Sequence, residues 1–233
     1  MFTLFTIAPD ARLVYRRFSG RDGMSTVTAR ASYRHGDLRD TLVQVGLRLA
    51  RTGGPDAVVL RQATREAGVS PNAAYRHFAD RNELLQAVSD AALGLAADRM
   101  EEEIAALPPT NDGAARARGC LRAVGTGYIR FAREEPGLFR TAFSVPDNLN
   151  NATSPAKAGR SGRTPFELVA WALDLLADAG LLPPERRRNA EFLAWSAVHG
   201  LGMLVIDGPL RGLTDELVDD ATTRMLDMVD RGI

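Results

Sequence analysis

Residues 60–78 read LRQATREAGVSPNAAYRHF and predict two short helices joined by a three-residue turn. Gly68 lies where the first helix should end, because glycine adopts the left-handed conformation without a steric cost from Cβ. Ser70 lies where the second helix should begin, because its hydroxyl can accept a hydrogen bond from a free backbone N–H. Pro71 comes next, at the first helical position, where a missing N–H costs nothing. Such a pair is typical of the helix-turn-helix, whose second helix enters the DNA major groove.

Charge is distributed unevenly along the 233 residues, although the formal net charge is zero. Residues 30–81 hold nine arginines and five acidic residues, whereas residues 82–233 hold sixteen basic and twenty-two acidic residues. A basic segment on an acidic body is typical of a phosphate-binding head attached to a regulatory domain. The single cysteine, Cys120, excludes an intramolecular disulfide and favours a reducing, cytoplasmic compartment. No apolar run approaches the ~20 residues that a membrane helix needs, so no membrane partner is expected.

Apolar residues recur at helical spacing along most of the chain, and no segment alternates in the manner of a strand. We therefore predict an all-α fold with about nine helices. Eight of the expected helices cover residues 35–51, 60–67, 71–77, 81–106, 113–134, 165–179, 185–206 and 214–230. A short helix that contains Leu138, Phe139 and Phe143 is expected after Pro136 and Gly137, which end the helix at residues 113–134.

Two segments lie outside this helical pattern. Residues 1–29 are expected to be a mobile extension, and Met24 is the expected natural start, because the first 23 residues fit poorly with the rest of the chain and lack the features of a signal peptide. Residues 144–164 are rich in Asn, Ser, Pro and Gly and predict a mobile loop.

These elements together resemble the TetR family of one-component transcriptional repressors. The resemblance covers about residues 30–231, and its most specific part is the block AGVSPNAAYRHF at residues 67–78. YIRFAREEPGLFRTAF (residues 128–143) and AWSAVHGLGMLVIDGPL (residues 194–210) resemble the Trp…His-Gly effector domain of one branch. The resemblance implies a three-helix DNA-binding head at residues 30–80 and a ligand-binding, dimerising body at residues 81–233.

Two positions depart from the family pattern. Val59 stands where the family has a capping Ser or Thr, and its side chain cannot cap the next helix. Ala63 stands where an Ile is common. Both changes can loosen that helix without disturbing the turn.

The predicted DNA contacts gather around the turn. Asn72 can pair bidentately with adenine, and Ala73 can approach a thymine methyl group. Arg61 matches a family position that reaches a base or a phosphate, and Tyr75, His77 and Arg81 match positions that hold phosphates. The predicted DNA-binding set is Arg61, Ser70, Pro71, Asn72, Ala73, Tyr75, His77 and Arg81. By contrast, Phe78 is predicted to be core.

In the body we expect an apolar cavity between the helices that begin near residues 81, 113 and 165 and the helix of Trp195. Such a cavity favours an apolar or amphipathic effector, and the loop at residues 144–164 is placed to gate it. The predicted lining set is Phe131, Phe139, Phe143, Trp171, Trp195, His199 and Met203. Ordinary core packing is the alternative for each residue in it.

A second subunit gives a further interpretation of the C-terminal helices. The family's last two helices pair with their copies in a four-helix dimer interface, so Trp195 and His199 could pack there instead. Leu217 and Met225 are the residues expected in that interface.

Enzymatic function is not expected, because the sequence offers no nucleophile elbow, phosphate loop, dinucleotide fingerprint or metal-ligand spacing. No cofactor or metal is therefore predicted. The leading hypothesis is a homodimeric repressor that a small molecule releases from a palindromic operator in double-stranded DNA. The alternative is a constitutive or protein-regulated DNA-binding dimer; an enzyme on a helical scaffold is the third hypothesis.

Overall fold

The structure is a computed structural model that describes residues 35–233, with side chains from Leu38 onward. The predicted extension at residues 1–29 and the start at Met24 lie outside the described residues. Residues 35–233 belong to one compact unit.

The described residues form ten α-helices and three 3-10 helices and contain no strand, which confirms the all-α prediction. The head contains α1 (His35–Gly53), η1 (Pro55–Ala57), α2 (Leu60–Ala67) and α3 (Pro71–Ala74). The body contains α4 (Arg81–Ala105), α5 (Gly113–Glu134), α6 (Pro136–Ala142), η2 (Leu149–Asn151), η3 (Pro155–Lys157), α7 (Pro165–Asp178), α8 (Pro184–Arg187), α9 (Ala190–Ile206) and α10 (Asp215–Gly232).

Side-chain caps fix where the long body helices begin. Asp80 accepts a hydrogen bond from the Glu83 N–H at 2.9 Å, at the position predicted for the start of α4. Asp112 accepts from two backbone N–H groups at the start of α5. Thr164 and Glu167 form a reciprocal capping box at the start of α7. These local contacts set the register in which each apolar face meets the core.

Two helix predictions need correction. The single helix expected over residues 185–206 is split into α8 and α9, because Asn189 adopts a left-handed conformation with φ 59° that no helix interior allows. This break makes ten α-helices in the described part of the chain, in place of nine. The recognition helix is also shorter than the predicted 71–77, since α3 ends at Ala74 and continues into a turn.

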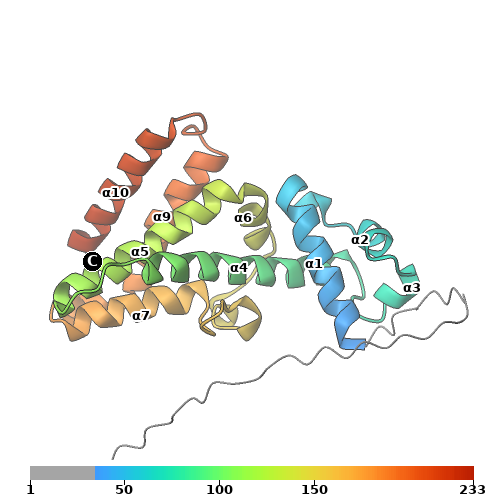
Figure 1. The fold of residues 1–233 in the computed structure, drawn as a ribbon, viewed down its shortest axis with the longest axis horizontal. Coiled ribbons are helices and arrows are strands. Elements are labelled where there is room, and N and C mark those ends of the chain that lie inside the picture. Colours follow the sequence, from blue (N-terminus) through green and yellow to red (C-terminus); the bar gives the residue numbers. More distant parts are fainter. Residues whose placement is uncertain (1–34) are drawn as a thin grey trace, which may run out of the picture. The chain divides into compact units, whose positions relative to one another are not determined.

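In Figure 1, α4 runs from the head through the middle of the body, between α5 and α7. α1 packs against both α4 and α6, and α10 packs against α5 and α9. The buried side chains form one continuous core that extends from Leu42 in α1 to the C-terminus. The head and the body therefore share a core. None of the described helices is long and apolar enough to cross a membrane.

Residues 144–164 are not an irregular loop, because they contain η2 and η3 and pack against α4. Lys157 in η3 is only 4% exposed, although the sequence around it is polar. A Cβ on Gly94 of α4 would lie 2.9 Å from the carbonyl oxygen of Ala158, so this segment approaches α4 closely. Its mobility stays a prediction.

Candidate DNA-binding and effector sites

The turn between α2 and α3 has the geometry predicted from its residues. Gly68 is left-handed with φ 68°, and the Ser70 hydroxyl oxygen accepts a hydrogen bond from the Ala73 N–H at 3.3 Å. Pro71 is the first residue of α3. Val59 makes no side-chain cap on α2, as expected for valine. The two helices are therefore fixed by the short-range contacts that the sequence encodes.

Around this turn, side chains divide between an outer face and the core. Phe78 and Ala74 are fully buried, which confirms Phe78 as a core residue. Tyr75 is 57% exposed although it is large and aromatic. The remaining predicted contacts are exposed at Arg61, Ser70, Pro71 and Asn72 and half-buried at Ala73 and His77. The outer face thus presents the predicted base-reading and phosphate-holding residues together.

Arg81 has a structural contact that the sequence did not reveal. Its Nε donates to the carbonyl oxygen of Val58 at 2.9 Å, and its Nη2 donates to that of Pro55 at 2.7 Å. The guanidinium therefore ties the start of α4 to the turn before α2. A phosphate contact by the same side chain stays a prediction.

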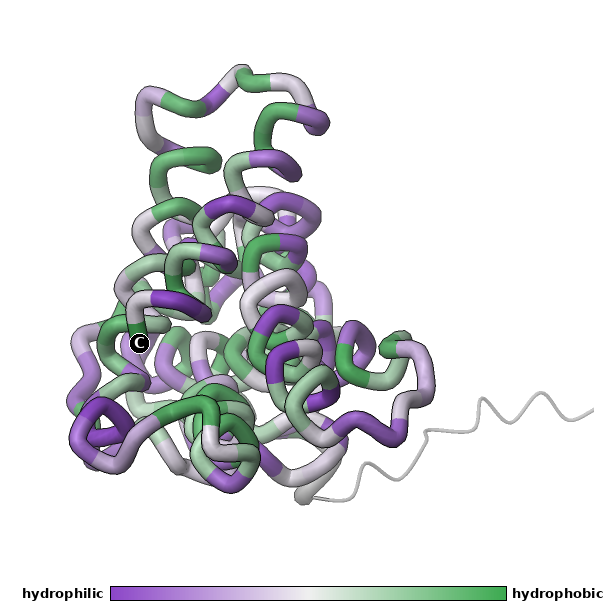
Figure 2. The backbone as a smooth tube through the Cα atoms, turned by 90° about the vertical axis from the view of Figure 1, so that its left-hand side faces the viewer, coloured by the Kyte–Doolittle hydropathy of each residue, from purple (hydrophilic) through white to green (hydrophobic). Residues whose placement is uncertain are grey.

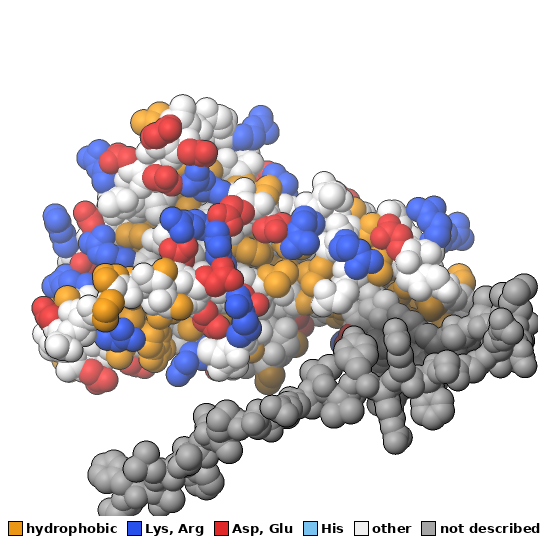
Figure 3. Space-filling model, in the orientation of Figure 1, with side chains coloured by type: hydrophobic (Ala, Val, Ile, Leu, Met, Phe, Trp, Pro, Cys, Tyr) orange, Lys and Arg blue, Asp and Glu red, His pale blue; other side chains and the backbone are white. Residues whose placement is uncertain are grey.

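Three further arginines give the helix-turn-helix its charge. Arg61, Arg65 and Arg76 are exposed, and none forms an ion pair with another described residue. Over the body, by contrast, red and blue side chains lie interspersed in Figure 3. Exposed, unpaired guanidinium groups are the usual partners of DNA phosphates.

The body contains a cavity of about 460 Å³. It lies between α4, α5, α7 and α9, as the sequence predicted, and residues of α10 and of the segment 145–157 also line it. Most of the wall is hydrocarbon, from residues such as Leu93, Leu121, Val124, Phe166 and Val198. Phe143 and Trp195, both in the predicted lining set, contribute aromatic surface.

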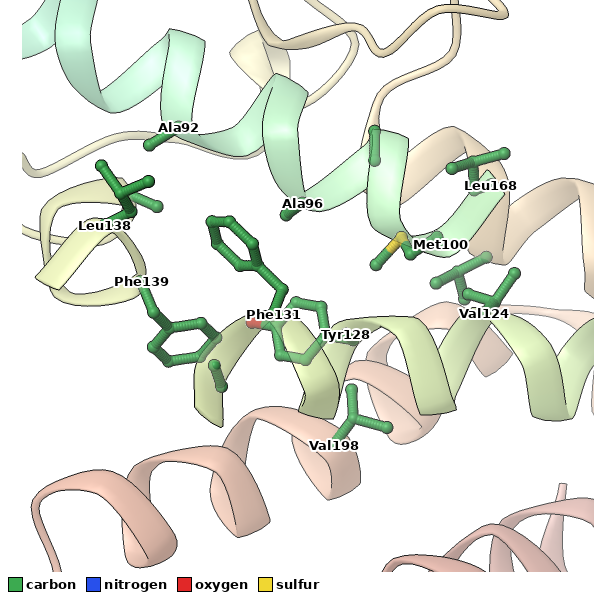
Figure 4. Close-up of a cluster of buried hydrophobic side chains, with 14 of the residues drawn as sticks. Ala92, Ala96, Met100, Val124, Tyr128, Phe131, Leu138, Phe139, Leu168 and Val198 are labelled. Atoms are coloured by element: carbon green, nitrogen blue, oxygen red, sulfur yellow. The ribbon is translucent and has the colours of Figure 1, made fainter. Parts of the chain in front are cut away.

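Two predicted lining residues belong to the core instead. Phe131 and Phe139 are 4% and 0% exposed, and neither lines the cavity. Figure 4 shows Phe131 among Ala92, Ala96 and Leu138, where α4, α5 and α6 meet. The rings of Phe131 and Phe139 fill the part of the body that is nearest the head. The cavity therefore lies on the far side of these rings from the head.

Three others lie outside the cavity wall. Met203 is 37% exposed on the outer side of α9. Trp171 is half-buried, with the Arg163 guanidinium 5.6 Å from the centre of its ring. His199 stacks on Phe139 with ring centres 5.6 Å apart, one layer behind the wall.

A buried hydrogen-bond network joins α5 to α9. The Tyr128 hydroxyl lies 2.8 Å from His199 Nδ1, and Trp195 Nε1 donates to the Tyr128 oxygen at 3.4 Å. Burial raises the pKa of Tyr128 and lowers the pKa of His199, so both are neutral at pH 7. Tyr128 lines the cavity, yet the sequence did not single it out, because its partners lie about 70 residues away.

An ion cluster lies at another part of the cavity wall. Lys157 Nζ donates to the Asp147 carboxylate and to the Asn151 carbonyl oxygen, and lies 3.8 Å from Asp90 of α4. The hydrogen bond from Lys157 lowers the pKa of Asp147, whereas burial raises the pKa of Asp90. The cluster therefore anchors the segment at residues 144–164 to α4.

α9 and α10 carry an exposed apolar face, which we define by Leu193, Leu204, Leu217 and Met228. These side chains are 62%, 42%, 54% and 62% exposed, respectively. Figure 2 shows hydrophobic residues recurring along the two helices that rise at the top of the view. Met225, predicted for a dimer interface, is half-buried and packs partly on the core, so Leu217 represents this face better.

No group of three or more His, Cys, Asp or Glu side chains in the described residues could hold a metal ion. The buried polar groups described above are hydrogen-bonded or ion-paired to one another. The arrangement offers an outer face for DNA and an inner apolar cavity. Together they define a DNA-binding regulator with a helix-turn-helix head and a helical body.

The chain belongs to the TetR family. Residues 42–88 match the family of bacterial regulatory proteins named after TetR, and residues 121–229 match the tetracyclin repressor-like C-terminal domain. The first match spans the helix-turn-helix and the second spans most of the cavity and the exposed apolar face. Family membership makes this chain a transcriptional regulator, not an enzyme.

Solved structures share this fold. A protein of unknown function from Rhodococcus sp. RHA1 is 25% identical with a TM-score of 0.63, over 88% of this chain and 99% of that one. RolR in complex with resorcinol is 18% identical with a TM-score of 0.58, over 83% and 88%. A TetR variant from Acinetobacter baumannii AYE, in complex with minocycline, is 20% identical with a TM-score of 0.55, over 83% and 91%. No curated protein matches this chain in sequence.

Proposed function

We propose that this regulator is a homodimeric repressor, released from a palindromic operator by a small apolar or amphipathic effector. The observation that carries the proposal is the apolar cavity of about 460 Å³ in the body of a helix-turn-helix protein. This volume lies in the range of small-molecule sites, roughly 300–1,000 Å³. Two neighbours in fold, RolR and the TetR variant, are complexes with small molecules. DNA as the partner implies a cytoplasmic location.

α6 offers a direct route from the cavity to the head. Ala142 and Phe143 line the cavity at its C-terminal end. At its other end a Cβ on Gly137 would lie only 2.3 Å from the carbonyl oxygen of Ala50, so the backbones of α6 and α1 are in contact. A ligand that displaces Phe143 would therefore move α1. It shifts the equilibrium only if it binds one arrangement more tightly than the other.

Movement of α1 matters because two recognition helices must fit one palindrome. In a dimer they must lie about one DNA turn, ~34 Å, apart. A ligand that changes this separation releases the operator. The alternative, a constitutive or protein-regulated dimer, gives the cavity no role.

The test begins with selection of DNA fragments by the purified full-length protein from a random pool. We expect an enriched palindrome whose two halves are one helical turn apart. A thermal-shift screen of small hydrophobic compounds then supplies ligands, and each is tested for release of the selected DNA. Enriched DNA without two-fold symmetry would contradict the dimeric repressor. Ligands that bind without releasing DNA would favour the alternative.

A second experiment tests the proposed subunit interface. Leu217→Asp places a charge on the exposed apolar face, so we expect a monomer that binds half of the palindrome weakly. Thr223→Asp is the matched control, because Thr223 is exposed on a different side of α10 from Leu217. Light scattering measures both variants and the wild type. A monomeric wild type at micromolar concentration would rule out the interface.

A further inference from the structure

The polar groups of the cavity wall fall into two sets. Tyr128 and Trp195 form one, and Asp147, Asn148 and Lys157 form the other. Between them the wall is almost entirely hydrocarbon. Because a buried polar group of a ligand needs a partner, these two sets decide which polar groups a ligand can carry.

The set around Lys157 offers no cation to an anionic ligand. Lys157 is the one basic side chain that lines the cavity within the described residues, and two carboxylates, Asp147 and Asp90, already surround it. Its ammonium also donates to the Asn151 carbonyl oxygen. Whether or not Asp90 is protonated, the cluster carries no net positive charge. A carboxylate or phosphate would enter an apolar cavity without a free counter-charge, which is strongly unfavourable.

Tyr128 has hydrogen-bonding capacity left for a ligand. Its side chain is almost fully buried, and its hydrogen-bond partners are His199 and the more distant Trp195. If neutral His199 carries its proton on Nε2, the Tyr128 O–H donates to Nδ1 and the phenol oxygen keeps a free lone pair. If the proton is on Nδ1, that N–H donates to the phenol oxygen and the O–H is free to donate. Tyr128 and His199 together can thus form a hydrogen bond with a ligand group that is able both to donate and to accept one.

Aromatic rings lie beside Trp195, whose Nε1 hydrogen-bonds to this hydroxyl. The rings of Phe143 and Phe166 lie 6.3 Å and 6.2 Å from the ring of Trp195, and all three residues line the cavity. At these distances the three rings contact one another as ordinary aromatic pairs, so they present one aromatic surface to the cavity on which an aromatic ligand can pack.

We propose that the cavity takes an uncharged aromatic molecule that bears a hydroxyl group, with that hydroxyl hydrogen-bonded to Tyr128. This inference rests on the proposed effector function and names the chemical class of the effector. An apolar ligand without a hydroxyl would leave the Tyr128 group unused, and an acidic ligand would lack a counter-charge.

The experiment compares three probes of nearly the same shape: 2-naphthol, naphthalene and 2-naphthoate. Equilibrium dialysis against the full-length protein at pH 7 gives the affinity of each. We expect 2-naphthol to bind most tightly of the three probes. The affinity for 2-naphthoate should be lower than that for 2-naphthol by roughly tenfold or more. Tyr128→Phe should lower the affinity for 2-naphthol about threefold to tenfold, the value of one neutral hydrogen bond, and leave that for naphthalene unchanged. Unchanged naphthalene binding also verifies that the variant is folded.

A second variant tests the charge argument independently of Tyr128. Asp147→Asn removes one carboxylate from Lys157, so the ratio of 2-naphthoate to 2-naphthol affinity should rise. Any of three results would overturn the inference. The wild type could bind 2-naphthoate more tightly than 2-naphthol, or Tyr128→Phe could lose equal affinity for 2-naphthol and for naphthalene. The third result is that 2-naphthol does not bind at all. DNA release is measured separately: binding of 2-naphthol without release would count against the repressor mechanism and leave the ligand class standing.

Discussion

Arg61, Arg65 and Arg76 of the head are exposed without an ion pair in the described residues, whereas most arginines of the body are paired with an acidic residue. In the body, Arg133 binds Asp219 at 2.5 Å, and Arg140 binds Asp207 at 2.6 Å. Arginine therefore has two different roles in this molecule. The paired guanidinium groups join one helix to another, and the unpaired ones keep their charge available.

We expect this difference to let a chain of zero net charge attract DNA. An exposed ion pair contributes little to stability and presents little net charge to a distant partner. An unpaired arginine contributes to the field that steers and holds phosphates. Composition alone does not distinguish paired from unpaired arginines. The positions of the ion pairs therefore indicate where positive charge is available to bind DNA.

The largest effect is expected on DNA affinity when the unpaired arginines are removed. The triple variant Arg61→Ala, Arg65→Ala, Arg76→Ala should lose on the order of 10³-fold in affinity at low salt, because charged contacts to phosphate are lost in both subunits. The slope of log affinity against log salt should fall by about 0.9 for each lost contact. Fluorescence anisotropy with the selected operator measures both quantities.

The matched control removes the same charge from the body. Arg116, Arg188 and Arg211 are exposed and have no ion pair within the described residues. Replacing all three with alanine should leave the affinity and the salt slope nearly unchanged. Equal losses in the two triple variants would mean that only net charge matters, and the contrast between head and body would fail.

A smaller effect is expected where the head meets the body. Gly137→Ala places a Cβ 2.3 Å from the Ala50 carbonyl oxygen and 2.5 Å from that of Arg51, both of them backbone atoms. Overpacking of this kind destabilises by about 1–3 kcal/mol. Urea denaturation measures it. Gly119→Ala is the control, since its nearest contact is a Leu107 side chain at 3.6 Å, and alanine in a helix gains up to about 1 kcal/mol. Equal stability of the two variants would contradict the close contact.

Base reading should be separable from phosphate binding. Asn72 is exposed on α3, so Asn72→Ala should relax the preference at one base pair of each half-site, by roughly 1–3 kcal/mol. The salt slope should not change, because the amide is uncharged. Sequencing of fragments selected by the variant measures the preference, and Asn111→Ala, an exposed site on the α4–α5 connection, is the control. An unchanged profile would remove Asn72 from the base-reading set.

The sequence predicted best those features that depend on neighbouring residues. Gly68, Ser70 and Asp80 took their predicted places, because a cap or a left-handed turn involves atoms only a few residues apart. Asn189 is also local, but an Asn within a segment predicted to be helical does not by itself indicate a left-handed residue.

The cavity was predictable in position but not in detail, since its wall depends on distant partners. Phe131 and Phe143 look alike in sequence, yet the first fills the core and the second faces the cavity. The Tyr128–His199 and Lys157–Asp90 contacts each join residues more than 60 positions apart. No spacing rule connects such pairs before the helices are packed.

The smallest effect is expected from breaking one paired arginine of the body. Arg140 and Asp207 tie α6 to the end of α9, and hydrogen bonds from Arg140 lower the pKa of Asp207. A depressed carboxyl pKa contributes stability above the unfolded pKa, about 4, and that stability is lost as pH falls through the folded pKa. Asp207→Asn should therefore cost about 0–1 kcal/mol at pH 7, because the pair is partly exposed. The cost should vanish near pH 2.

Urea midpoints of the wild type and Asp207→Asn at both pH values test this. Asp178→Asn is the control, because Asp178 is exposed without an ion pair in the described part of the chain, and it should show no such pH-dependent difference. DNA affinity of Asp207→Asn should equal that of the wild type, since Arg140 lies in the body. A cost that persists unchanged at low pH would show that the ion pair with Arg140 is not the source of the contribution of Asp207. A large loss of DNA affinity would instead mean that the paired arginines of the body also contribute to DNA binding by the head. The proposed difference in role between the arginines of the two regions would then be wrong.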